Sequence, residues 1–200
     1  MIEIYRMEQR PITFAYMNLV FKIREHWREI ATWTRAYLIS KFVGVGYHQE
    51  VFSRLYDVPA DMGSMFLLLF GNEIADQYVE LLSEHVVLLR DYIDSIAAGD
   101  EAVANEKYAE LYRNADERAA FLSSINPYWD ETEWRNMLYT YLNLTFQEVR
   151  SFLTGEYRTN ISIYDRLITH TENMGDYFTG GMYDYITYNP TQQPLPQPAE

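Results

Sequence analysis

The sequence predicts an all-α fold, a single antiparallel helical bundle of four long helices plus shorter helices. Long stretches lack Pro and Gly, and apolar residues within them recur at alternating three- and four-residue steps. No segment alternates apolar and polar residues for long enough to make a sheet. The chain has 200 residues, of which 48% are hydrophobic and 16% aromatic, so it can bury a sizeable core in one domain.

The first half of the chain contains two of the predicted long helices. The first covers about residues 12–42 and ends before Gly44. Its apolar row is Tyr16, Leu19, Ile23, His26, Ile30, Trp33 and Tyr37. A less regular stretch follows, with a short helix expected around residues 49–56, another after Pro59, and a stop at Gly71. The second long helix, residues 72–98, has the row Ile74, Tyr78, Leu81, His85, Leu88 and Tyr92.

The second half contains the other two long helices. Asp100 is expected to cap the third, residues 101–124, and a capping box at Asp130 starts a helix to about residue 142. The third helix has the row Ala104, Tyr108, Leu111, Ala115, Arg118 and Leu122. A second capping box at Thr145 predicts that the helix restarts there and stops at Gly155. The last long helix, about residues 156–178, has the row Ile163, Leu167, His170, Met174 and Tyr177, with two glycines beyond.

Three segments are expected. Residues 1–11 form an N-terminal segment, residues 12–186 the helical bundle domain, and residues 187–200 a Pro/Gln-rich tail that is expected to be disordered.

Charge and composition exclude several classes of function. The 29 acidic and 16 basic residues give a net charge of -13, which disfavours binding to nucleic acid or an anionic membrane. The absence of Cys excludes disulfides and thiolate metal sites. No secretory signal or membrane-spanning run is recognised, so we expect a cytoplasmic protein. Gly-rich phosphate loops and a nucleophile elbow are also missing.

Three of the four histidines lie on apolar rows of different helices. In a bundle such rows converge, so His85 and His170, with Asp165, are candidate ligands for a transition metal. The alternative is a core histidine bonded to Tyr, Asp or a carbonyl, which is more common. The Glu-x-x-His signature of dimetal carboxylate bundles is absent, because Ile23, Leu82 and Leu167 stand three residues before the histidines.

Two arginines are unusual for a helical core. Arg35, next to Trp33, and Arg118 both need a carboxylate partner or an anionic ligand if they are buried. Asp116 and Asp165 are candidate partners. Arg35, Trp33 and Asp116 are therefore candidate ligand-binding residues.

Several segments resemble a family of small, all-helical, uncharacterised bacterial proteins. The matching stretches are residues 33–35 (WTR), 80–85 (ELLSEH), 114–116 (NAD), 120–129 (AFLSSINPYW), 133–135 (EWR), 137–138 (ML), 142–145 (LNLT), and Tyr164, Asp165, His170 and Met174. Members commonly carry His where this chain has Ile30 and Tyr141. The resemblance implies an inward polar site that includes the Tyr141 position and that this chain has partly lost. Some similar proteins carry the name acetylglutamate kinase, but the sheet and phosphate loops of amino-acid kinases are missing here.

The leading hypothesis is a non-enzymatic bundle that binds a metal or small ligand in its core through His and Asp. The alternative is a structural or protein-interaction module with no bound ligand, and a metal-dependent redox enzyme is a minority hypothesis. The sequence does not identify the ligand or a protein partner, and a homo-oligomer stays possible.

Overall fold

The computed structural model describes residues 13–188, and this part of the chain is helical, with no strand. The predicted all-α class is confirmed. The helices are α1 (Phe14–Val43), α2 (His48–Phe70), α3 (Asn72–Ala98), α4 (Glu101–Ile125), α5 (Glu131–Leu153) and α6 (Tyr157–Tyr188). The expected N-terminal segment 1–11, and nearly all of the expected tail, lie outside the described residues.

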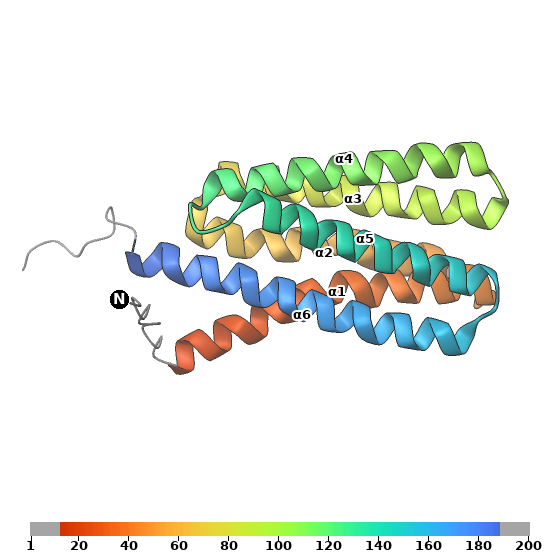
Figure 1. Ribbon diagram of the computed structural model, residues 1–200, viewed down its shortest axis with the longest axis horizontal. Helices are drawn as coiled ribbons and strands as arrows, with labels where there is room; N and C mark the ends of the chain where they lie inside the picture. Colours follow the sequence, from red (N-terminus) through yellow and green to blue (C-terminus); the bar gives the residue numbers. More distant parts are fainter. Residues whose placement is uncertain (1–12, 189–200) are drawn as a thin grey trace, which may run out of the picture.

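The helices form a closed ring of antiparallel neighbours around one core. Each helix packs against the helix that follows it in the sequence, and α6 returns to pack along α1 (Figure 1). All helices run along the long axis of the molecule, so α1 begins and α6 ends at the same end of the bundle. Side chains that point inward from α1, α3, α4 and α5 therefore meet in the centre.

Local signals at the helix ends act as the sequence predicts. Gly44, Gly71, Gly99 and Gly155 follow α1, α2, α3 and α5, each with a positive φ that favours glycine. The Asp130 carboxylate accepts a hydrogen bond of 2.9 Å from the backbone N–H of Glu133 and caps α5.

Replacing Asp130 with alanine is expected to lower the free energy of unfolding by about 1 kcal/mol, because α5 loses its N-cap acceptor. Chemical denaturation of the two proteins measures this difference. Asp130→Asn is the matched control, since its amide oxygen can still accept the bond, and it should stay within about 0.5 kcal/mol of the parent protein. An equal loss in both variants would contradict a capping role.

Two helices that we expected to be interrupted are continuous, so the prediction of four long helices with shorter ones is wrong in this detail. α2 runs through Pro59, whose side chain is buried in the core, and all helices have between 23 and 32 residues. Thr145 is not a cap but a buried residue inside α5, where its hydroxyl donates a 2.9 Å bond to the Tyr141 carbonyl. Burial of these side chains outweighs the local preference for a helix break.

α6 also continues past the expected stop, through Gly180 and Gly181 to Tyr188. Gly181 is needed for packing: a Cβ built at this position would lie 2.0 Å from Nε1 of Trp129. The Trp129 indole lies across α6 there and donates a 3.3 Å bond to the Phe178 carbonyl. A glycine pair that usually ends a helix is here a site of close approach.

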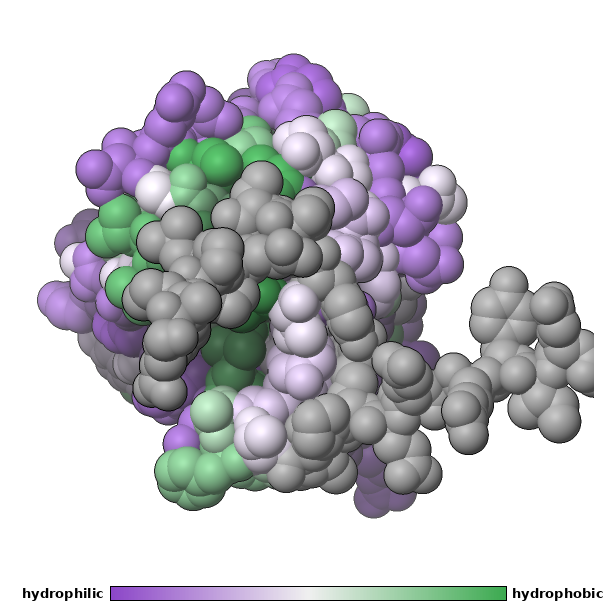
Figure 2. Space-filling view, turned by 90° about the vertical axis from the view of Figure 1, so that its left-hand side faces the viewer, coloured by the Kyte–Doolittle hydropathy of each residue, from purple (hydrophilic) through white to green (hydrophobic). Residues whose placement is uncertain are grey.

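The end of the bundle where α1 begins and α6 ends exposes apolar side chains beside charged ones (Figure 2). Leu68 near the end of α2 is 86% exposed and Phe14 at the start of α1 is 84% exposed. Between residues 13 and 188, no helix is long and apolar enough to cross a membrane.

Candidate functional site

A small enclosed cavity lies in the centre of the bundle, where four helices meet. Its volume is about 10 Å³, which is the space of one water-sized body. The residues that line it are Trp27, Ile30, His85, Arg118, Leu138 and Tyr141. None of them is more than 4% exposed, so the cavity is sealed from solvent.

The lining contains polar atoms without hydrogen-bond partners. Among residues 13–188, no group bonds to either ring nitrogen of His85, to Nε of Arg118, to Nε1 of Trp27 or to the Tyr141 hydroxyl. Buried polar groups are nearly always bonded, and each unsatisfied one costs about 1–3 kcal/mol. Five such atoms lie on residues that line this one cavity, which makes it the candidate site.

The cavity is electropositive. Arg118 is 2% exposed, and no carboxylate in the described part of the chain forms an ion pair with it. Burial, followed by the charge of Arg118, holds the pKa of His85 well below its usual 6.5, so this imidazole is neutral. Burial also raises the pKa of Tyr141 to about 12, so its hydroxyl keeps its proton. The charge of Arg118 is the only full charge that the lining residues carry.

Similarity to known proteins does not identify the site. No protein-family model, curated protein or solved structure matches this chain. Its chemistry therefore has to be inferred from its own residues.

The sequence-predicted residues divide into those that reach the cavity and those that do not. His85 and Tyr141 line it, and their rings lie 5.8 Å apart. Asp116 lies instead at the surface, where it accepts bonds from Arg135 (2.8 Å) and from the Tyr139 hydroxyl (2.9 Å). Asp116 therefore does not neutralise Arg118, although the two residues are close in sequence.

The predicted metal ligands are only partly brought together: Asp165 and His170 line one open groove between α5 and α6, whereas His85 lines the central cavity. His170 lies between α5 and α6, where its Nε2 is 2.8 Å from the Met137 carbonyl oxygen, and Asp165 is exposed on α6. His170 thus makes the carbonyl contact of the structural alternative, whereas His85 has no partner among the described residues. Residues 13–188 contain no group of three or more His, Cys, Asp or Glu side chains placed to hold a metal ion.

Arg35 belongs to a second buried polar site, which it forms with Glu148 of α5. Its guanidinium pairs with the Glu148 carboxylate, which is 0% exposed, and lies 4.3 Å from the centre of the Tyr164 ring. Burial raises the pKa of Glu148 to about 7, although the Arg35 charge opposes the shift. Glu148 is the fourth residue of the expected capping box at Thr145, and no other pattern in the sequence singles it out. Trp33 is half-buried at the edge of the core and does not reach the cavity; the Arg54 guanidinium lies 5.4 Å from its ring.

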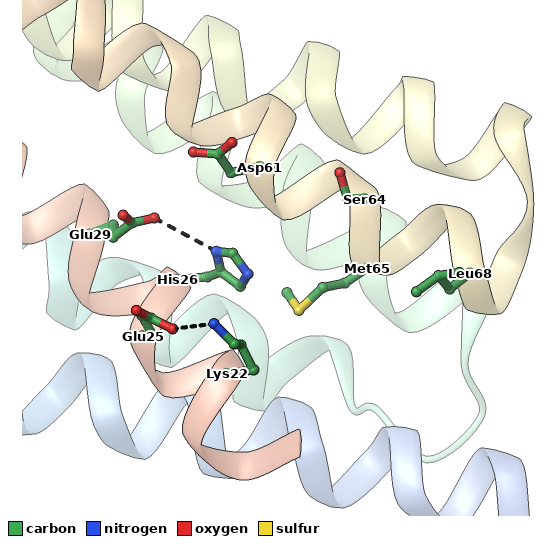
Figure 3. A pocket seen from close by; sticks show the side chains of 8 residues that line it. All are labelled: Lys22, Glu25, His26, Glu29, Asp61, Ser64, Met65 and Leu68. Atoms are coloured by element: carbon green, nitrogen blue, oxygen red, sulfur yellow. Dashed lines mark hydrogen bonds and ion pairs between the residues drawn. The ribbon is translucent and has the colours of Figure 1, made fainter. Parts of the chain in front are cut away.

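An open groove between α1 and α2 is a second candidate site, because several ionisable side chains line it (Figure 3). Its residues are Lys22, Glu25, His26, Glu29, Asp61, Ser64, Met65 and Leu68, and its volume is about 410 Å³. Its acids are already used in ion pairs: Glu25 with Lys22 at 2.9 Å, and both Glu29 and Asp61 with Arg54 at 3.0 and 3.3 Å. Arg54 serves two of these acids, so the groove keeps one excess negative charge, but each of its acids has a cationic partner. The central cavity, whose Arg118 has no carboxylate partner among residues 13–188, is therefore the stronger candidate.

Proposed function

We propose that this protein is a binding protein, and that its ligand is a small species held in the central cavity. The observation that supports the proposal is the set of unpartnered polar atoms on His85, Arg118, Tyr141 and Trp27 around one sealed space. A core that was only structural would be expected to pair these atoms or to replace them with apolar side chains. The cavity volume limits the ligand to an ion or molecule of very few atoms.

The arrangement favours binding over a metal-dependent reaction. A cation in the cavity would lie beside the Arg118 guanidinium, and no carboxylate lines the cavity to offset the repulsion. The chemistry that fits the cavity is therefore hydrogen bonding and charge attraction. If the protein is instead a structural module, we expect that the cavity holds water and that no solute stabilises the fold.

A comparison of two histidine variants tests the proposal. His85→Leu removes two unpartnered nitrogens from the cavity, whereas His170→Leu removes a histidine of the neighbouring helices that lies outside it. The thermal unfolding midpoint is measured for both variants and for the parent protein with zinc, nickel, ammonium, chloride, formate and formamide. We expect at least one solute to raise the midpoint saturably in the parent and in His170→Leu, but not in His85→Leu.

Two outcomes would contradict the proposal. One is that no solute shifts the midpoint of the parent protein. The other is that every stabilising solute acts equally on His85→Leu. The first outcome would favour the structural alternative. Without ligand, His85→Leu should be at least as stable as the parent, because it no longer buries two unsatisfied nitrogens.

A further inference from the structure

The charge of the cavity is the first indication of its ligand. A guanidinium stays protonated inside proteins, and a buried charge is normally paired or bound to a counter-ion. Arg118 has neither partner among the described carboxylates, since its neighbour Asp116 bonds to Arg135 and Tyr139. The group that completes the site should therefore carry one negative charge.

The hydrogen-bonding capacity of the lining gives the second indication. Arg118 Nε, Trp27 Nε1 and the Tyr141 hydroxyl are all donors, and neutral His85 adds one more. A water molecule would accept some of these bonds, but it must also donate two of its own. The lining offers two acceptors, the unprotonated ring nitrogen of His85 and the Tyr141 hydroxyl oxygen, so water can place its own hydrogens there. Water leaves the Arg118 charge uncompensated, whereas an anion accepts from the donors and also offsets that charge.

The size of the cavity gives the third indication. A volume of about 10 Å³ is the least that holds one water molecule, so a larger single atom such as chloride enters only if the surrounding side chains move outward. Sulfate and phosphate, each with five heavy atoms, are too large. The site should therefore discriminate between anions by size as well as by charge.

From these three observations we propose that the cavity is a halide site, and that its ligand is chloride held by Arg118, His85, Tyr141 and Trp27. The inference rests on the proposed function and specifies the ligand class of the same site. Chloride neutralises Arg118 and accepts the unpartnered donors without introducing a new donor that needs a partner. The bundle then acts as a chloride-binding protein, whose stability depends on the chloride concentration.

Chloride titration tests the proposal on the full-length protein. The protein is dialysed into sodium gluconate, whose anion is too large for the cavity, and sodium chloride is added at constant ionic strength. We expect a saturable rise in the thermal unfolding midpoint, of about 5–10 °C at a hundredfold excess over the dissociation constant. Arg118→Met should abolish the rise. Arg113→Met, which removes an exposed arginine of the same helix, should retain it.

An anion series separates site binding from general salt effects. Excluded salts such as sulfate stabilise proteins without any site, and that effect would persist in Arg118→Met. A chloride site instead requires chloride to exceed sulfate in the parent protein and the order to reverse in the variant. Should Arg118→Met fail to fold, Arg118→Lys keeps the charge but not the planar fork, and it should bind chloride more weakly.

The result that would overturn the inference is an equal chloride response in the parent and Arg118→Met, or a stronger response to sulfate than to chloride. If formamide or a metal ion gives the His85-dependent stabilisation instead, the chloride assignment fails and the proposed binding function stands. If no solute gives it, both fail.

Discussion

Replacing Arg35 with alanine is expected to lower the free energy of unfolding at pH 8 by about 3–5 kcal/mol, because it leaves the Glu148 carboxylate buried without a counter-charge. Glu148 is 0% exposed and Arg35 is only 18% exposed, so little solvent screens the pair. Oε2 of Glu148 has no hydrogen-bond partner among residues 13–188. Urea denaturation at fixed pH measures the loss.

The same carboxylate predicts how stability changes with pH. Its pKa is raised from 4.5 to about 7 on folding, so the folded state binds the proton more tightly than the unfolded chain does. The contribution of Glu148 is therefore full below pH 4.5 and is lost as the pH rises to 7, by about 3 kcal/mol in total. His85 acts in the opposite direction, since its lowered pKa costs stability as the pH falls below 6.5.

The variant Glu148→Gln isolates the pH dependence of stability that Glu148 causes. The stability difference between Glu148→Gln and the parent protein should change by about 3 kcal/mol between pH 4.5 and 7, in favour of the variant at the higher pH. The loss in Arg35→Ala should be smaller at pH 5, where Glu148 is protonated. A pH-independent difference between Glu148→Gln and the parent would show that Glu148 does not titrate in this range.

Gly181→Ala is expected to destabilise the protein by about 2–3 kcal/mol, although alanine favours helices more than glycine does. The added Cβ would meet the Trp129 ring at 2.0–2.2 Å, and the ring also packs against Phe178 at 4.5 Å and Trp134 at 5.9 Å. Relief of the clash would require the indole to move and to give up its bond to the Phe178 carbonyl. Chemical denaturation measures the loss.

A double-mutant cycle with Trp129→Leu attributes that loss to the clash. Leucine leaves space beside α6, so Gly181→Ala should cost nearly nothing in the Trp129→Leu background and could even stabilise it through helix propensity. An equal loss in both backgrounds would place its cause outside the contact with Trp129.

The sequence predicts the helices well and much of the buried faces, including Ile23, Ile30 and Tyr37 of α1, but it misplaces individual members of two rows by one residue. In α1 the predicted row contains His26 and Trp33, whereas the buried residues are Trp27 and Thr34. In α6 the same one-residue difference puts Thr171 inside in place of His170. One residue turns a helix by about 100°, so this difference moves both histidines from the core to its margin.

Periodicity predicts residues of the candidate site only in helices whose predicted apolar row matches the buried face. The rows of α3 and α4 contain His85 and Arg118, and both line the cavity. The predicted α1 row contains His26 and so omits Trp27, which lines the cavity. The partners of Arg35 and Asp116 could not be predicted, since they depend on which helices become neighbours and on how far each is shifted along its axis. Spacing within a helix contains no such information.

The enclosure of the cavity also has a kinetic consequence. Every lining residue is at most 4% exposed, so an ion can enter or leave only when helices of the bundle move apart. Association would then be slower than the roughly 10⁵–10⁷ M⁻¹s⁻¹ of sites that open to solvent, and its rate would follow the opening of the bundle. Such a site would report the average ion concentration over the time between openings and would not follow brief changes.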